Sequence, residues 1–155
     1  MKRILVLSDT HRHVSLSLRV IPAVKPDAII HLGDMVSDAE EIEACFPDIP
    51  LYNVRGNNDF APLDAERVFE IFGVRLFCAH GHTIRVERGI DRAKEENCKA
   101  YLYGHTHIGK CEWQDGILIL NPGSITRPRD SVFSFGIIEI ENGNITGCVC
   151  PAMGY

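Results

Sequence analysis

The sequence has no excess of positive charge, which argues against general nucleic-acid binding. Its 155 residues include 16 Lys and Arg against 21 Asp and Glu, a formal net charge of -5. Sequence-independent binding to duplex nucleic acid depends on a cationic surface that displaces counterions from the phosphates. We therefore expect no duplex nucleic acid among the partners of this protein.

Long hydrophobic runs are also missing. The apolar segment near the N-terminus, Ile4 to Leu7, is too short for the core of a signal peptide or for a membrane span. The six cysteines, at positions 45, 78, 98, 111, 148 and 150, lack the spacing of a disulfide framework. We expect a cytoplasmic protein with reduced thiols and no membrane partner.

Only the last two cysteines invite another interpretation. Cys148 and Cys150 are two residues apart, so on a strand their side chains share one face. Packing of that strand and binding of a metal ion both fit this spacing, and a lone C-x-C pair favours packing.

The length and composition fit one domain. A chain of 155 residues with 45% hydrophobic residues can bury a substantial core. The sequence contains no internal repeat, low-complexity tract or linker rich in Pro and Ser. We predict a single domain over residues 1–155.

The first third of the chain alternates strand and helix patterns, which predicts a parallel sheet. Apolar, β-rich runs predict three strands, and helical spacing with Pro26 as a stop predicts the first helix. The expected elements are a strand at Arg3–Leu7, a helix at Leu16–Val24, a strand at Ala28–Leu32, a helix that starts near Ser37–Glu40, and a strand at Leu51–Val54.

After Pro62 the pattern changes to one that predicts a second sheet. Two strands joined at Gly73 read as an antiparallel hairpin, and the remainder alternates strands with turns rich in Gly, Asn and Pro. The expected elements are strands at Arg67–Phe72 and Val74–Ala79, a helix at Ile90–Cys98, a strand at Ala100–Tyr103, and further strands up to Cys150. Helices with two stacked sheets predict a layered α/β sandwich.

Five short polar segments each follow an apolar run, so all five can lie at the carboxyl ends of strands, where open α/β sheets bind ligands. Together they supply the oxygen and imidazole ligands of a two-metal centre. They are Asp9-Thr10-His11, Gly33-Asp34, Gly56-Asn57-Asn58-Asp59, His80-Gly81-His82 and Gly104-His105-Thr106-His107.

The oxygen ligands divide by their chemistry. An extended backbone would direct Asp9 and His11 to one side, where they can share an ion. Asp34 has two carboxylate oxygens and can bridge two cations about 3.5–4 Å apart. Asn57 offers a neutral amide oxygen. Taken singly, each oxygen ligand also fits an ordinary turn or capping residue, so these assignments depend on the whole set.

The histidines after the later strands are the more specific signal. His105 and His107, two residues apart after an apolar strand, are typical of paired metal ligands, and His80 is assigned to the second metal. His82 fits either a group that contacts a ligand or a substrate, or a loop histidine without such a role. Arg127 could pair with a phosphate oxygen, as could Arg129, although both also fit exposed loop charges.

In this order the motifs resemble the signature of the calcineurin-like metallophosphoesterase superfamily: D-x-H, G-D, G-N-x-D/E, a later H and G-H-x-H. With the segment Asn121-Pro122-Gly123-Ser124 and its short length, the chain looks most like the small YfcE-like phosphodiesterase branch. The resemblance implies an α/β fold that is a four-layer αββα sandwich, with two mixed sheets flanked by helices. It further implies one metal held by Asp9, His11, Asp34 and His107, and another held by Asp34, Asn57, His80 and His105.

The resemblance also implies an activity. Two divalent ions, with Mn²⁺ preferred over Ni²⁺, Fe²⁺, Zn²⁺ or Mg²⁺, would lower the pKa of a water toward about 7 for attack on a small phosphodiester. Much of the superfamily has a leaving-group histidine where this chain has Asn58, and an amide cannot donate that proton as an acid. We therefore expect diesters with good leaving groups to be preferred, with Asn58 and His82 as the catalytic contacts.

A different class of function is open to the same fold. The resemblance includes a retromer subunit that acts as a protein-interaction scaffold. All seven proposed ligands are able to bind metal in this chain, which favours the enzyme. Exposed strand edges also favour a possible homodimer.

Overall fold

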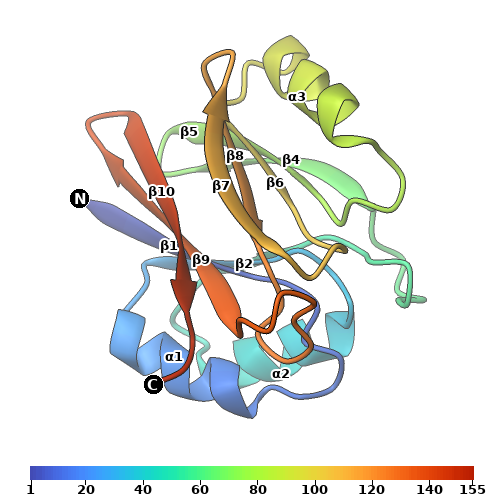
Figure 1. The fold of residues 1–155 in the computed structure, drawn as a ribbon. Helices are drawn as coiled ribbons and strands as arrows, with labels where there is room; N and C mark the ends of the chain where they lie inside the picture. The colour runs from blue at the N-terminus through green and yellow to red at the C-terminus, as the bar shows by residue number, and fades with distance from the viewer.

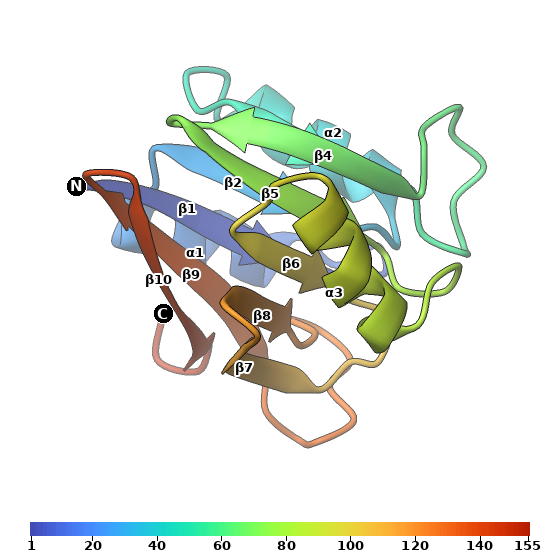
Figure 2. The same ribbon diagram turned by 90° about the horizontal axis from the view of Figure 1, so that it is seen from above.

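The computed structural model describes residues 1–155 and contains two five-stranded sheets stacked on one another (Figure 1). The helices α1 (Ser15–Val24) and α2 (Val36–Cys45) cover the outer face of the first sheet, and α3 (Val86–Glu95) covers the outer face of the second. Figure 2 shows the same four layers from the side of α3. The expected αββα sandwich of two mixed sheets is confirmed.

The ten strands divide equally between the sheets, in the orders β10-β9-β1-β2-β3 and β4-β5-β6-β8-β7. They are β1 (Lys2–Leu7), β2 (Ala28–His31), β3 (Leu51–Asn53), β4 (Glu66–Ile71), β5 (Val74–Ala79), β6 (Ala100–Tyr103), β7 (Gly109–Gln114), β8 (Ile117–Pro122), β9 (Ser134–Glu141) and β10 (Asn144–Pro151).

Each sheet has a parallel part and antiparallel margins. Strands β1, β2 and β3 are parallel neighbours in the first sheet, as are β5, β6 and β8 in the second. The hairpin β4-β5 and the pairs β7-β8, β1-β9 and β9-β10 are antiparallel. The loops that leave β1, β2, β3, β5 and β6 come together, as their hydrogen bonds below show, because parallel strands end at one edge of a sheet.

Three apolar cores hold the layers together. The largest, with 18 buried residues, lies between the two sheets, and the other two lie under α1 and α2 and under α3. Strand β1 contributes to two of them, with Ile4 and Val6 facing the second sheet and Leu5 and Leu7 facing the helices. Burial on both faces explains why β1 and β2 read as continuous apolar runs rather than alternating ones.

The third helix begins earlier than expected. It covers Val86–Glu95 rather than Ile90–Cys98. Its interior glycine, Gly89, weakens the helical signal in sequence, yet the fold needs it, because a Cβ there would lie 2.3 Å from the ring of Tyr101. None of the three helices has the length and apolar character needed to cross a membrane.

Candidate metal centre

The structure brings all seven proposed ligands together from the loops after five strands. The ligand atoms of Asp9, His11 and His107 lie within 4.8 Å of one another, and those of Asp9, Asp34 and His80 form a second such group.

Asn57 and His105 adjoin the second of these groups. Asn57 Oδ1 lies 3.0 Å from His80 Nε2 and 3.1 Å from His105 Nδ1. Side chains from both sheets therefore converge on one small volume.

Two carboxylates lie between the histidines, where sequence reasoning placed only Asp34. Asp34 Oδ2 lies 3.8 Å from His11 Nε2 and 3.5 Å from His80 Nε2. Asp9 Oδ1 is 3.1 Å from His107 Nε2 and 3.8 Å from the Nε2 atoms of His11 and His80. Both carboxylates therefore lie centrally among the histidines, and bridging of two metals by Asp34 stays a prediction.

The oxygen atoms of Asp9 have different environments. Oδ2 accepts hydrogen bonds from the Ser8 hydroxyl at 2.5 Å and from the backbone N–H of His105 at 3.0 Å. Oδ1 is buried and has no hydrogen-bond partner. Burial opposes ionisation of Asp9, but the His107 and His80 imidazoles and the Ser8 hydroxyl hold the pKa of its carboxyl below the ordinary value. A buried, ionised oxygen without a donor suits a cation.

Backbone carbonyls orient two of the imidazoles toward this oxygen. The Nδ1–H of His80 donates to the carbonyl oxygen of Leu32 at 2.7 Å, and that of His107 donates to the carbonyl of Arg127 at 2.6 Å. In the neutral form of each ring the Nε2 lone pair then faces the centre, as in proteins where a carbonyl orients a metal-bound histidine. The contact of His107 with Asp9 raises the pKa of His107, so a metal ion would compete with a proton at that nitrogen. His11 Nε2 lies 3.3 Å from His107 Nε2. Burial lowers the pKa of His11, which favours the neutral ring that a metal requires.

The backbone at the ligands is unusual. Asp9, His11, Asp34, His105 and His107 all have left-handed φ angles, between 45° and 67°. The expected extended backbone at Asp9 and His11 is therefore wrong, although both side chains do reach the same group. Each such residue costs about 1–3 kcal/mol, and this strain is typical of functional loops that the surrounding fold holds in place.

Asp59 has a role that sequence reasoning missed. Its buried carboxylate accepts three backbone N–H groups, from Asp34 at 3.0 Å, Gly56 at 2.8 Å and Val36 at 2.8 Å. It therefore ties the loop after β2 to the loop after β3 and to the start of α2. The available signal was its place as the last residue of the segment Gly56 to Asp59.

His31 lies on β2 as expected and also supports the site. Its Nδ1 accepts the backbone N–H of Gly33 at 3.2 Å, so its Nε2–H donates to the Thr10 hydroxyl at 3.0 Å. Complete burial lowers the pKa of His31 and keeps the ring neutral. The signal in the sequence for the contact of His31 with Thr10 was a polar residue inside an apolar strand. Ser124 contacts the same loop after β1, because its hydroxyl donates to the carbonyl of Asp9 at 2.9 Å.

Close backbone approach explains two of the motif glycines. A Cβ at Gly56 would lie 2.1 Å from Asp34 Oδ1, and a Cβ at Gly104 would lie 2.0 Å from the Ser8 hydroxyl oxygen. Any side chain at either position would displace a group that contacts or belongs to the candidate ligand set.

The two proposed catalytic contacts lie beside this set. Asn58 donates its side-chain N–H to Asp34 Oδ2 at 2.7 Å. The ring of His82 lies 5.3 Å from that of His80, and its Nδ1 is buried without a hydrogen-bond partner. Burial, followed by the neighbouring His80 and His105 imidazoles, lowers the pKa of His82.

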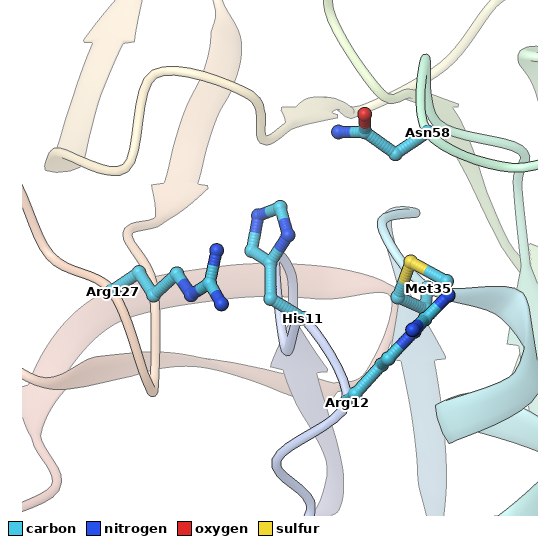
Figure 3. Close-up of a pocket in the computed structure, with 5 residues that line it drawn as sticks. All are labelled: His11, Arg12, Met35, Asn58 and Arg127. Carbon is cyan, nitrogen blue, oxygen red and sulfur yellow. The ribbon is translucent and has the colours of Figure 1, made fainter.

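A pocket of about 390 Å³ opens beside His11. Its other lining residues are Arg12, Met35, Asn58 and Arg127 (Figure 3). Of the two arginines singled out in the sequence, Arg127 lines this pocket. Arg129 does not line it, and its backbone N–H donates to the carbonyl of His107 at 3.0 Å.

The terminal cysteines lie outside the site. Cys148 and Cys150 share one face of β10 with their sulfur atoms 3.6 Å apart. Cys150 is half-buried and packs on the core under the first two helices, as strand packing predicts, whereas Cys148 is exposed. All six cysteines are free thiols.

Sequence comparison matches most of this chain to one family of proteins. A model of the calcineurin-like phosphoesterase superfamily domain matches residues 1–143. A probable metallophosphoesterase of Mycoplasma pneumoniae is 32% identical over 137 residues, which cover 84% of this chain and 83% of the relative. A phosphodiesterase of Methanocaldococcus jannaschii is 28% identical over 160 residues, covering 88% of this chain and 92% of the relative.

Solved structures have the same fold. A predicted phosphoesterase from Streptococcus pneumoniae superposes with a TM-score of 0.79 at 28% identity, covering 97% of this chain and 90% of that one. Vps29 from Chaetomium thermophilum has a TM-score of 0.75 at 18% identity, covering 96% and 94%, and at that identity the likeness concerns the fold alone. On the match to the family model, this chain belongs to the calcineurin-like phosphoesterase superfamily.

Proposed function

We propose that the protein is a metal-dependent phosphodiesterase that hydrolyses small phosphodiesters at a dinuclear centre. The observation that carries this proposal is the environment of Asp9 Oδ1, a buried oxygen without a hydrogen-bond donor that faces three imidazole Nε2 atoms. Oxygen and neutral imidazole donors together suit divalent transition-metal ions.

In the proposed assignment the two metals share Asp34. Its Oδ2 atom lies within 3.8 Å of a histidine from each group. The first ion would be held by Asp9, His11 and His107, and the second by Asn57, His80 and His105, with Asp34 common to both. When bound, such ions supply a hydroxide at neutral pH and neutralise charge on a phosphate. Mixed nitrogen and oxygen donors accept several divalent ions, and we propose Mn²⁺.

We also propose a preference for diesters over monoesters and for good leaving groups. Asn58 lies where it can contact a leaving group but cannot give it a proton, so leaving groups that depart as stable anions are favoured. His82 is the second proposed contact, since its unpartnered Nδ1 lies close to the ligand His80. The name of the Methanocaldococcus jannaschii relative, a phosphodiesterase, supports the same preference.

The test is hydrolysis of bis-p-nitrophenyl phosphate and p-nitrophenyl phosphate by chelator-treated protein, before and after addition of Mn²⁺. We expect the diester to be cleaved faster, only with metal, and not by the Asp34→Ala or His107→Ala variants. Asp48→Ala is the matched control, because Asp48 is exposed and outside the ligand set. Metal binding without cleavage of either ester would favour the protein-interaction scaffold instead, and failure to bind metal would overturn the proposal.

We propose a cytoplasmic protein that forms a homodimer through an exposed strand edge. The edge strand β7 carries Trp113, a residue that is 56% exposed, and unpaired edges favour association. Light scattering coupled to gel filtration would test this, and a monomer at all accessible concentrations would exclude the dimer.

A further inference from the structure

The pocket beside His11, called here the arginine pocket, contains two guanidinium groups and no acidic lining residue. It is lined by His11, Arg12, Met35, Asn58 and Arg127. Figure 3 shows Arg12 and Arg127 on either side of the His11 ring. Both arginines are exposed, and neither guanidinium makes a hydrogen bond or ion pair with the protein. Their charges are therefore free to bind an anion from solution.

The backbone holds both arginines next to the candidate metal centre. Arg12 directly follows His11 in the chain, and its backbone N–H donates to the buried carboxylate of Asp38 at 2.8 Å. The N–H of Arg127 donates to the Ser124 hydroxyl at 2.8 Å, and its carbonyl accepts the ring N–H of His107 at 2.6 Å. Each arginine is thus anchored beside a different proposed ligand, while its side chain extends into the pocket.

The remaining two lining residues, Met35 and Asn58, fit an organic group that joins a phosphate at the metals to an anionic group at the arginines. Met35 supplies an apolar, adaptable surface. Asn58 connects the pocket to the centre, since it contacts both the pocket and Asp34. A substrate with its reacting phosphate at the metals would extend one substituent along Met35 and Asn58 toward the two arginines.

We propose that the arginine pocket binds a second, non-reacting phosphate group of the substrate. The preferred substrate class is then a small phosphodiester in which one alcohol carries a phosphate monoester. Guanidinium groups bind the oxygens of a phosphate through paired, charge-assisted hydrogen bonds. This inference rests on the proposed phosphodiesterase function, because it specifies the substrate of that site.

The overall charge of the protein makes the inference testable. With a net charge of -5, the chain as a whole disfavours a more negative substrate. A preference for the additional phosphate therefore requires a local cationic site rather than the average field.

The experiment compares matched p-nitrophenyl phosphodiesters in the Mn²⁺-loaded protein at constant ionic strength. Their second alcohol is an ethyl, propyl or butyl chain that ends either in hydrogen or in a phosphate monoester, and every substrate releases p-nitrophenolate. For at least one chain length we expect the terminal phosphate to raise kcat/KM about tenfold or more, as two charge-assisted hydrogen bonds predict.

Variants then locate the effect. Arg12→Gln and Arg127→Gln should each reduce the ratio of kcat/KM between phosphorylated and plain substrates, and the double variant should abolish the preference. Arg19→Gln is the control, because Arg19 is exposed on α1, makes no ion pair and lies outside the pocket; it should leave the ratio unchanged. Circular dichroism confirms that the variants are folded.

The outcomes separate this inference from the function on which it rests. If the plain diesters are cleaved but no chain length gives a preference, the arginine pocket is not a phosphate site. A preference that survives in the double variant likewise contradicts the proposal. If no diester is cleaved at all, the proposed function itself fails.

Discussion

Asn58 donates its side-chain N–H to Asp34 Oδ2 at 2.7 Å, and its backbone N–H donates to Asp34 Oδ1 at 3.0 Å. The residue that follows the proposed ligand Asn57 is thus bonded twice to the proposed bridging carboxylate, and its side chain also lines the arginine pocket. The side chain at position 58 therefore touches both the proposed bridging carboxylate and the pocket, where we propose that the leaving group lies.

The first prediction concerns this position. Asn58→His would introduce a group that can protonate a leaving group, so it should increase cleavage of a diester with a poor leaving group, such as the phenolate of methyl phenyl phosphate. General acids contribute about 10²–10⁴-fold in evolved sites, and we expect at least about tenfold here. The measurement is kcat/KM for methyl phenyl phosphate relative to p-nitrophenyl phenyl phosphate. Asn58→Ala, which has no acid, should show no increase; an equal gain in both variants would contradict this role.

The second prediction uses the unpartnered oxygen of Asp9. Asp9→Asn keeps one oxygen for the donors Ser8 and His105 but removes the negative charge from the centre. The wild-type Tm should rise on addition of Mn²⁺, because a ligand at 100 times its Kd stabilises by about 2.7 kcal/mol. The Asp9→Asn Tm should not respond. Asp48→Asn should behave as wild type, and a full Mn²⁺ response in Asp9→Asn would show that Asp9 is not a ligand.

The third prediction concerns the loops beneath the centre. In Asp59→Asn one of the two acceptor oxygens becomes an N–H₂ group, so the backbone N–H of Val36, or those of Asp34 and Gly56, lose their partner. We expect the free energy of unfolding to fall by about 1–3 kcal/mol, the cost of an unsatisfied buried group. Urea denaturation of metal-free protein measures it. A change below the experimental error would mean that these hydrogen bonds do not hold the loops.

The fourth prediction is a pH dependence far from the centre. Asp27 accepts hydrogen bonds from the Lys2 ammonium at 2.8 Å and from the backbone N–H of Arg3 at 2.8 Å, and these two contacts lower its pKa. A lowered folded-state pKa stabilises the protein above the unfolded-state value and ceases to do so as pH falls through the folded-state value. The free energy of unfolding of the wild type should therefore be higher than that of Asp27→Asn by up to about 1 kcal/mol at pH 7.

Urea denaturation of both proteins between pH 7 and pH 3 checks this sign. The difference in unfolding free energy should shrink as the solution becomes acidic. A difference that grows toward low pH would contradict the assignment of the shift to Asp27.

The fold was more predictable from the sequence than the details of the site. Apolar runs and turn residues located most of the elements. Strands β1 and β2, for example, are buried on both faces and therefore appear in the sequence as continuous apolar runs. The start of α3 was not predicted, because a glycine such as Gly89 disfavours a helix in the sequence pattern. The fold needs a glycine there because the ring of Tyr101, on strand β6, packs against it. Long-range packing of that kind has no local signal.

At the site, the sequence indicated which residues converge but not how. The motifs named all seven proposed ligands, yet the left-handed backbone at Asp9 and His11 was not foreseen, because contacts such as the Ser124 hydroxyl impose it from a distant loop. The supporting role of Asp59 was equally hidden, since its partners are backbone N–H groups of other segments.

The two sheets contribute opposite halves of the ligand set. Asp9 and Asp34 follow strands of the first sheet, whereas His80 and His107 follow strands of the second. Any ion bound between them would cross-link two layers that otherwise share an apolar core and a few hydrogen bonds between their loops, such as that from His80 to the carbonyl of Leu32. Amide hydrogen exchange in β2 and β6 should then slow together on metal loading, so that the proposed metal centre would also determine whether the two halves of the sandwich open separately or as one cooperative unit.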